Sequence, residues 1–459
     1  MATPISQTQP DANKPHVLIV GAGLAGLLLG VLLDKQGVSY EIFERSSKVR
    51  PLGAVMSLNP NILPAIEQLG LLEELEAVSL PSAGFHIYNS DMKLISAIGS
   101  SIKDSAGYDF LLFARFKFYD ILLSRIAPEK IHFSKNITDI AQDDKSASIT
   151  CSDGTNYSGD ILVGADGTYS AIRQGLYKQM REEKVLPESD SKSMSKGYIC
   201  LVGTTNPLDP EKYPVLKNET CVLYQIIGEG TQYTWSSVNT CENRICWNAI
   251  IQLSASQEDN IQNVEWGPEA NEAMIKEVRD FKVPIGCTLG DLIDASPKET
   301  ISRVFLEDKI FESWSHNRVV LIGDACHKLL PSAGQGAVNA MQDSVILANC
   351  IYDLESLSTK DVSAALKDYR EQRFPHVIEQ HEASKLNAKI IYGQKLLDRV
   401  IRNIVLNYLP KSFQEKNSKR NLAYRPQATF MPLAPKRGEM DVLPQKPSKR
   451  YQAQQTTTV

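Results

Sequence analysis

Cysteine is scarce in this chain of 459 residues, which holds 8 cysteines at scattered positions. The closest pair, Cys241 and Cys246, lacks the spacing of a zinc site or of a redox-active motif. The sequence also begins without the apolar segment of a secretory signal peptide. We therefore expect no metal site, reduced and mostly buried thiols, and a cytoplasmic location.

Long apolar runs and a strong charge excess are lacking as well. The first apolar run, residues 16–33, is interrupted by glycines and falls short of the roughly 20 residues that cross a bilayer. Hydrophobic residues make up 42% and charged residues 22% of the chain, which excludes a collagen-like, wholly disordered or membrane-embedded protein. The formal net charge of −5 argues against a nucleic-acid partner.

A glycine-rich turn is present in that first apolar run. Gly21, Gly23 and Gly26 form the pattern Gly-x-Gly-x-x-Gly between a strand expected at 15–20 and a helix expected at 23–35. The first glycine makes the bend, the second lets the backbone approach a pyrophosphate, and the third lets the helix pack closely on the strand. Because the helix N-terminus offers N–H donors to phosphates, the pattern predicts a dinucleotide site.

An acidic residue follows at the end of the second predicted strand. Glu44 lies 23 residues after Gly21, where a carboxylate accepts hydrogen bonds from ribose hydroxyls. Its charge disfavours the 2′-phosphate of NADP, although Arg45 beside it weakens that argument. The motif therefore favours NAD or FAD.

Two further motifs lie later in the chain. Residues 164–173 read Gly-Ala-Asp-Gly-Thr-Tyr-Ser-Ala-Ile-Arg, and residues 323–327, Gly-Asp-Ala-Cys-His, lead into Pro-Ser-Ala-Gly-Gln-Gly-Ala at 331–337. With the three motifs in this order, the sequence resembles the single-component FAD-dependent aromatic hydroxylase and epoxidase monooxygenases, a para-hydroxybenzoate hydroxylase-like family. The resemblance covers about residues 15–375.

The resemblance implies an FAD site assembled from all three motifs. Asp324 matches the acid that binds the ribityl chain of the flavin, and Arg115 matches an arginine near the flavin and pyrophosphate, a role that suits a planar cation. The N–H groups of the helix-entry loop would face the flavin ring, where a helix N-terminus stabilises negative charge. The implied cofactor-binding residues are Gly21, Gly23, Gly26, Glu44, Arg45, Gly53, Ala54, Arg115, Asp166, Gly167, Asp324, Pro331, Gly334, Gln335, Gly336 and Ala337.

Some of these residues also have plain structural interpretations. Asp166 and Asp324 are then helix caps or turn acids, Arg173 forms a surface ion pair, and His327 is structural. For Arg173 and His327 we favour the structural interpretation, whereas the combination of motifs favours the cofactor site for the glycines, Glu44, Arg115 and Asp324.

The same resemblance implies a fold. We expect an α/β protein: a Rossmann-like FAD-binding domain with an inserted β-sheet substrate domain and C-terminal helices. The predicted boundaries are a disordered lead at 1–14, the FAD-binding domain at 15–196 and 307–392, the substrate domain at 197–306, a basic amphipathic helix region at 393–424 and a disordered tail at 425–459.

The chemistry implied by the resemblance is oxygen transfer. NADH or NADPH reduces FAD, reduced flavin and O2 form a C4a-hydroperoxide, and one oxygen atom passes to an aromatic ring or an alkene. We expect an oxidoreductase acting on a small aromatic or terpenoid-like substrate, and we assign no catalytic residue. Candidates for the apolar substrate wall are Tyr198, Tyr224, Tyr233, Trp235 and Trp247.

Two alternatives stay open at this point. The first is an FAD-dependent reductase or halogenase of the same fold, although the Trp-x-Trp-x-Ile motif typical of the halogenases is missing. The second is a non-catalytic FAD-binding protein at a membrane surface.

The charge of the chain is unevenly distributed. Residues 393–459 carry 13 Lys/Arg and 4 Asp/Glu, so this region is +9 while the first 392 residues are −14. From Leu396 to Leu409, apolar residues fall on one helical stripe. Such a basic amphipathic helix either lies on an anionic membrane, through residues 393–424, or docks on the enzyme body. Both interpretations stay open.

Overall fold

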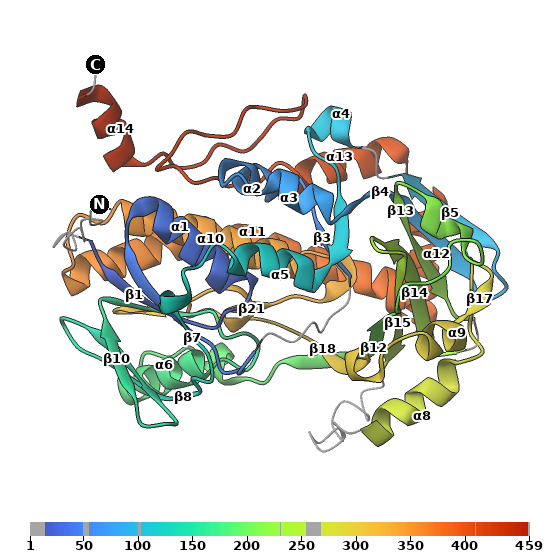
Figure 1. Ribbon diagram of the computed structural model, residues 1–459, viewed down its shortest axis with the longest axis horizontal. Coiled ribbons are helices and arrows are strands. Elements are labelled where there is room, and N and C mark those ends of the chain that lie inside the picture. The colour runs from blue at the N-terminus through green and yellow to red at the C-terminus, as the bar shows by residue number, and fades with distance from the viewer. Residues whose placement is uncertain are drawn as a thin grey trace, which may run out of the picture.

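Two large β-sheets, two small ones and the helices around them form the described structure (Figure 1). It is a computed structural model, and it describes residues 14–48, 55–99, 102–229, 231–253, 268–408 and 410–457. Parallel and antiparallel strands with helices between them confirm the expected α/β fold. Most of the predicted lead at 1–14 lies outside the described residues.

The first sheet is largely parallel and carries the glycine-rich turn. In spatial order its strands are β19 (Ser315–His316), β20 (Val319–Leu321), β11 (Ile161–Gly164), β1 (His16–Val20), β2 (Ser39–Phe43) and β7 (Ile131–His132). Every neighbouring pair is parallel except β19 with β20. Because a parallel sheet is covered on both faces, β1, β11 and β20 read as continuous apolar runs.

The apolar run at 16–33 is a strand, a turn and the start of a buried helix. α1 (Leu24–Gln36) buries 11 of its 13 residues and packs on β2 and on α10 (Gly336–Tyr352). A helix that is buried all round is apolar all round, which explains the hydropathy of this run. Within the described part of the chain, no helix is both long and apolar enough to cross a membrane.

The second sheet is larger than the inserted sheet that the sequence predicts. In spatial order it contains β21 (His327–Lys328), β18 (Ser302–Ile310), β12 (Ser195–Thr204), β15 (Arg244–Gln252), β14 (Tyr233–Thr240), β13 (Cys221–Ile227), β4 (Leu80–Asn89), β6 (Leu111–Ala114) and β3 (Val55–Leu58), with β5 (Leu94–Gly99) beside β4. The strands β3 to β6 come from the first part of the chain. They join the insertion where β4 pairs in parallel with β13, a long-range contact that no local sequence pattern reports.

The two faces of the second sheet have different neighbours. On the outer face, Trp235 and Trp247 pack with residues of α8 (Pro268–Val278) and α9 (Leu289–Asp294). The opposite face, which we call the inner face, packs with Leu330 and with the end of α11 (Thr359–Tyr392). Its residues include Tyr198, Cys200, Val202, Val238, Cys246, Ile250 and Leu306.

Shorter elements fill the remaining surface of the body. α6 packs on β8, at a small antiparallel sheet formed by β8, β9 and β10, while β16 and β17 form a separate hairpin. These elements are α2 (Leu63–Gln68), α3 (Leu72–Ala77), α4 (Lys103–Ala106), α5 (Arg115–Leu123), β8 (Ile137–Gln142), β9 (Ala147–Cys151), β10 (Asn156–Gly159), α6 (Ala171–Glu182), β16 (Lys282–Val283) and β17 (Cys287–Thr288).

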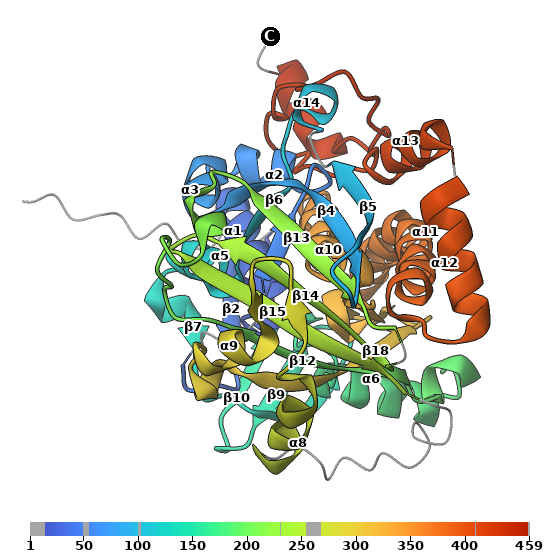
Figure 2. The same ribbon diagram turned by 90° about the vertical axis from the view of Figure 1, so that its right-hand side faces the viewer.

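The C-terminal region contains a helix where the sequence predicts one, but its last part differs from the predicted disordered tail. α12 (Leu396–Tyr408) is the expected amphipathic helix and lies beside α11, followed by α13 (Lys411–Asn421) (Figure 2). Residues 421–457, here called the C-terminal strap, run back over α2 and end in α14 (Lys449–Thr457) (Figure 1). Instead of the disordered tail expected from residue 425, the strap buries Ala428, Phe430 and Met440.

Candidate functional site

The glycine-rich turn has the geometry that its pattern predicts. Gly21 has a φ of +107°, and a Cβ there would lie 2.4 Å from the carbonyl oxygen of Ala165. A Cβ on Gly26 would lie 2.0 Å from the carbonyl oxygen of Gly21, so only glycine lets α1 pack this closely on the turn. At Gly23 a Cβ would meet nothing within 4 Å. The turn is therefore closed toward the sheet and open at Gly23.

Glu44 lies directly beside this turn. Its carboxylate accepts hydrogen bonds from the backbone N–H of Ala22 at 3.0 Å and of Ser46 at 2.8 Å. Each carboxylate oxygen keeps a further lone pair for another donor, as a ribose hydroxyl would be. Arg45 is exposed next to it.

The second motif connects two loops rather than standing alone. Asp166 accepts hydrogen bonds from the N–H of Ile172 at 3.1 Å and from the Ser170 hydroxyl, so its observed contacts are those of a cap for α6. Burial raises the pKa of Asp166 above its usual range. Gly167 beside it has a φ of +79°, a conformation that favours glycine.

Arg173 is not the surface ion pair that its plain structural interpretation gives. It is 7% exposed and donates to the carbonyl oxygens of Thr168 at 2.8 Å and of Ala325 at 2.9 Å. The guanidinium also lies 4.3 Å from the ring centre of Phe311. Arg173 therefore fastens the Asp166 loop to the third motif.

Asp324 of the third motif lies beside a lysine. It forms an ion pair with Lys328 and accepts a hydrogen bond from the Thr168 hydroxyl at 3.3 Å. Burial alone would raise the pKa of Asp324, but Lys328, His327 and Arg115 outweigh that effect and lower it. The carboxylate thus stays ionised as an acceptor, and Arg115, at the exposed start of α5, lies near enough to act on it.

The loop before α10 completes the set of predicted residues. Gly334 has a φ of +63° and lies against β3, since a Cβ there would be 3.0 Å from the Ser57 hydroxyl. A Cβ on Gly336 would meet nothing within 4 Å, so the loop is open at the N-terminus of α10. Pro331 is exposed, while Gln335 and Ala337 are half-buried. The predicted loop residues Gly53 and Ala54 lie outside the described residues.

Sequence reasoning missed the buried ion pair behind these loops. Asp343 accepts hydrogen bonds from the N–H of Gly323 and from Nε of Arg373, both at 2.8 Å, and lies 2.6 Å from Nε2 of His327. The three side chains are 0% exposed. A charged residue within apolar helical sequence was the available signal, because such a charge needs a buried partner.

A potential metal site in the described residues is better explained by this pair. Cys326, His327 and Asp343 offer ligand atoms within 4.8 Å of one another. The carboxylate of Asp343, however, already faces the Arg373 cation and a backbone N–H.

Most residues predicted for the substrate wall lie on the outer face of the second sheet. Tyr233, Trp235 and Trp247 pack on the outer face, and Tyr224 contacts the same cluster. Of the five candidates only Tyr198 lies on the inner face. Because side chains alternate along a strand, composition could not tell the two faces apart.

The inner face approaches the cofactor loops and is not purely apolar. The Cys246 thiol lies 3.2 Å from the N–H of Val55 in β3, and Leu330 directly precedes the loop of Gly334. The Asn248 amide donates to the Ser236 hydroxyl at 2.6 Å, in register with this face. The side-chain amide oxygen of Asn248, although buried, has no hydrogen-bond partner among the described residues.

Comparisons with known proteins agree on one family. The FAD binding domain family matches residues 14–384. An FAD-dependent monooxygenase of Aspergillus flavus is 26% identical over 442 residues, covering 93% of this chain and 89% of that protein. An FAD-dependent monooxygenase of Penicillium ochrochloron is 28% identical over 388 residues, covering 82% and 88%. HpxO of Klebsiella pneumoniae, solved with FAD and uric acid, shares the fold at a TM-score of 0.72 and 20% identity, covering 90% and 97%.

The chain therefore belongs to the FAD binding domain family. Within it, the fold, the three motifs and the similar proteins define an FAD-dependent monooxygenase of the single-component aromatic hydroxylase type, an oxidoreductase. The residues present fit FAD: two glycine turns are open beside the N-termini of α1 and α10, and the carboxylates of Glu44 and Asp324 offer acceptors of the kind that ribose and ribityl hydroxyls need.

Proposed function

We propose that this monooxygenase uses NADH or NADPH and O2 to hydroxylate an aromatic ring or to epoxidise an alkene in a small lipophilic substrate. Bound FAD supplies the electron transfer and oxygen activation, while the protein binds, orients and shields. The observation that carries the proposal is the convergence of the three motifs: Gly21 lies against Ala165 of the second motif, and Arg173 fastens the second motif to Ala325 of the third. A reductase, a halogenase and a protein without turnover are less well supported, because the similar curated proteins are monooxygenases.

In this proposal each loop holds one part of the cofactor. The open turn at Gly23 and the N-terminus of α1 hold the pyrophosphate, and Glu44 accepts hydrogen bonds from the adenosine ribose. Asp324 accepts from the ribityl hydroxyls, with Arg115 and Lys328 keeping it ionised. The N-terminus of α10 at Gly336 faces the flavin ring and stabilises negative charge there.

The inner face of the second sheet supports a substrate with an apolar body and one polar group. Cys200, Val202 and Ile250 offer an apolar surface next to the cofactor loops. The side-chain amide oxygen of Asn248, which has no partner among the described residues, is an acceptor for a hydroxyl or N–H group of the substrate. This pattern suits an aromatic or terpenoid-like molecule carrying one hydrogen-bond donor.

Turnover tests this reaction directly. Purified protein with FAD should oxidise NADH or NADPH faster when an aromatic or terpenoid-like substrate is added, with consumption of O2 and a product heavier by one oxygen atom. Lack of stimulation across a broad panel of such compounds would contradict the proposal. The Asn248→Leu variant should raise KM for the accepted substrate more than it lowers kcat.

Cofactor binding tests the assignment of the site residues. Glu44→Ala and Asp324→Ala should each weaken FAD binding by more than about tenfold, the size expected for a lost hydrogen bond to a charged group. Glu41→Ala is the matched control, because Glu41 lies in β2, the strand that Glu44 directly follows, but pairs with His16 and His132. Full FAD occupancy in both site variants would remove the assignment.

We further propose that α12 holds the enzyme at an anionic membrane surface. Several of its apolar residues face outward: Leu396, Leu397 and Tyr408 are 81%, 69% and 72% exposed. Its polar residues Asp398 and Arg402 face inward, and Arg402 donates to the carbonyl oxygen of Gly393 at 2.9 Å. An exposed apolar helix face therefore lies in a region rich in lysine and arginine, which suits lipids with negative headgroups. A lipophilic substrate would be drawn from the same surface.

Vesicle flotation tests whether α12 binds an anionic membrane or is only an exposed helix. The full chain should float with phosphatidylserine-containing vesicles and much less with pure phosphatidylcholine vesicles. Leu397→Ser combined with Ile404→Ser should abolish flotation, while Leu386→Ser, at an equally exposed position of α11, should not. Equal flotation of all variants would overturn the membrane proposal.

A further inference from the structure

A buried arginine joins both flavin-facing loops. Arg373 of α11 is 0% exposed and pairs with Asp343, which in turn holds the N–H of Gly323 at 2.8 Å. The same guanidinium donates to the side-chain oxygen of Asn339 at 2.9 Å and to the backbone carbonyl oxygen of Asn339 at 3.2 Å. Asn339 lies in the first turn of α10, just after Gly336. The position of Arg373 therefore affects both the Asp324 turn and the N-terminus of α10.

The C-terminal strap covers this arginine. The Tyr424 ring centre lies 5.3 Å from the Arg373 guanidinium, within the range of a cation–π contact. Tyr424 also stacks on His376, one turn further along α11, with ring centres 3.6 Å apart and planes 19° apart. Burial, followed by the nearby Arg373 charge, lowers the pKa of His376 to about 4, so a neutral ring stacks there at pH 7.

Tyr424 is also held from the opposite direction. Its carbonyl oxygen and that of Asn421 accept hydrogen bonds from the Asn61 amide, each at 2.9 Å. The carbonyl oxygen of Asn61 accepts from the amide of Gln342 in α10 at 3.1 Å. The strap residue nearest to Arg373 is thus fixed to α10 as well as to α11.

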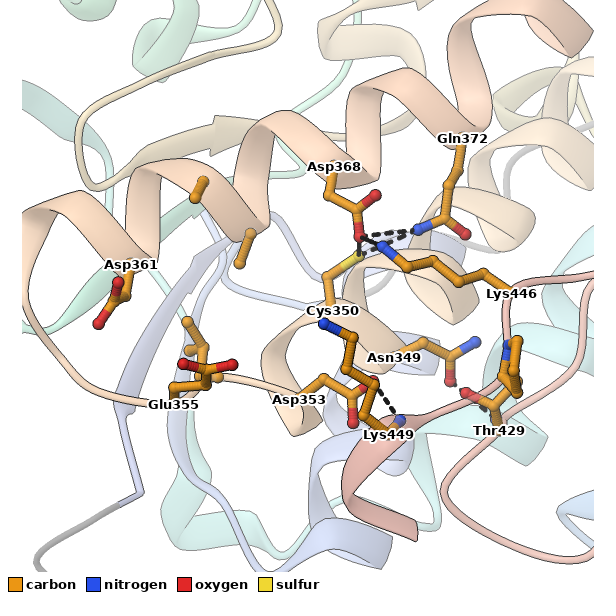
Figure 3. A pocket seen from close by; sticks show the side chains of 14 residues that line it. Asn349, Cys350, Asp353, Glu355, Asp361, Asp368, Gln372, Thr429, Lys446 and Lys449 are labelled. Carbon is orange, nitrogen blue, oxygen red and sulfur yellow. Dashed lines mark hydrogen bonds and ion pairs between the residues drawn. The ribbon is translucent and has the colours of Figure 1, made fainter. Parts of the chain in front are cut away.

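The rest of the strap is fastened to the body rather than resting on it. Arg425 is 4% exposed and donates to the carbonyl oxygen of Ala106 at 2.7 Å. Figure 3 shows the far attachment, where Lys446 lies 2.7 Å from Asp368 at a cavity of about 360 Å³ between α10, α11 and the strap. These contacts fix where Tyr424 lies over Arg373.

We propose that the C-terminal strap is part of the flavin site, with Tyr424 as a positioning residue that acts through Arg373 and Asp343 on the Gly323 turn and the start of α10. The strap lies beyond residue 384, where the family match ends. The inference rests on the proposed FAD site, because its effect is on the loops assigned to FAD. Loss of the Tyr424 ring exposes Arg373 to water, loosens both loops and weakens FAD binding.

The test compares two aromatic residues of the strap in the full-length protein. Tyr424→Leu should weaken FAD binding by up to about tenfold, the limit reached if the whole of a buried cation–π contact is coupled to the FAD-bound arrangement of the loops. Tyr424→Phe, which keeps the ring, should restore wild-type affinity. Phe430→Leu is the matched control: Phe430 is 7% exposed and stacks on Tyr352, away from Arg373, so it should lower thermal stability without changing FAD affinity.

Hydrogen exchange in the apoprotein provides a second readout. Amides of residues 321–327 and 336–340 should exchange faster in Tyr424→Leu than in Phe430→Leu or the wild type. Equal exchange and equal FAD affinity in the two leucine variants would overturn the positioning role. If even the wild type fails to bind FAD, the proposed flavin site fails, while the exchange experiment still decides whether Tyr424 controls the loops.

Discussion

The two C-terminal parts of the molecule, α12 and the strap, are built in opposite ways. α12 has the clearest amphipathic pattern of the region, yet Leu397, Ile404 and Tyr408 of its apolar stripe are exposed. The strap shows no periodic pattern, yet Phe430 and Met440 are buried against the body. The helix whose sequence predicts a buried apolar face exposes much of that face, whereas the strap, which has no such pattern, packs on the body.

The contrast shows what attaches a segment to a protein. The strap is held by side chains that bind its backbone: Gln68 accepts from the N–H of Ala428 and Asn349 accepts from the N–H of Thr429, each at 2.9 Å. Such contacts need amide side chains on the body, not a pattern in the segment itself. α12 is held through the inward-facing Arg402, which leaves its apolar side for another partner.

Removal of the strap should have the largest effect on stability. A chain ending at residue 420 loses the burial of Leu422, Phe430 and Met440 and the contacts of Arg425. At about 1.5–3 kcal/mol for each large apolar side chain, the loss reaches several kcal/mol, a large part of a typical folding free energy. Urea unfolding of the two chains measures it. An unchanged midpoint would mean that the strap is detached in solution.

A single buried cation in the strap should account for a smaller share. Arg425→Met leaves the carbonyl oxygens of Ala106 and Leu422 without their donor and should cost about 2 kcal/mol of unfolding free energy. Arg399→Met in α12 is the matched control, because Arg399 is exposed and should change stability by less than about 0.5 kcal/mol. Similar losses in both variants would contradict the contrast between the two parts.

Docking of the strap should also depend on pH. Since the pKa of His376 is lowered to about 4 from its usual 6.5, the unfolded chain binds a proton that the folded protein does not accept between these values. Stability should therefore fall as pH drops from 6.5 to 4. Because the ring is only half-buried, we expect about 1 kcal/mol after screening. Thermal unfolding of His376→Gln should show a flatter pH dependence, and an identical slope would exclude this histidine as the cause.

Much of the fold and the cofactor loops could be predicted from the sequence because local rules decide them. Gly21 and Gly26 are required because a Cβ at either position would collide with a backbone carbonyl oxygen. Glu44 follows from its distance along a βαβ unit. The parallel strands are recognisable because burial on both faces makes them apolar throughout.

The rest depends on pairings between distant parts of the chain. No local feature indicates that β4 pairs with β13, or that Trp247 faces outward while Cys246 faces the cofactor loops. The role of Arg173 was misjudged for the same reason, since its partners Thr168 and Ala325 come from two separate motifs. Tyr424 was missed because it lies outside any helix or strand and its partner Arg373 is on α11, in a distant part of the chain.

The smallest effect is expected on the exposed side of α12. Leu397 and Ile404 are 69% and 52% exposed, so changing both to serine removes little buried area and should alter the unfolding free energy by less than about 0.5 kcal/mol. Met440→Ser in the strap, at 7% exposure, should by contrast cost about 2 kcal/mol. Urea unfolding at two protein concentrations measures both. A large loss for the α12 variant that grows with protein concentration would show that a second copy of the chain, rather than a lipid surface, covers this face.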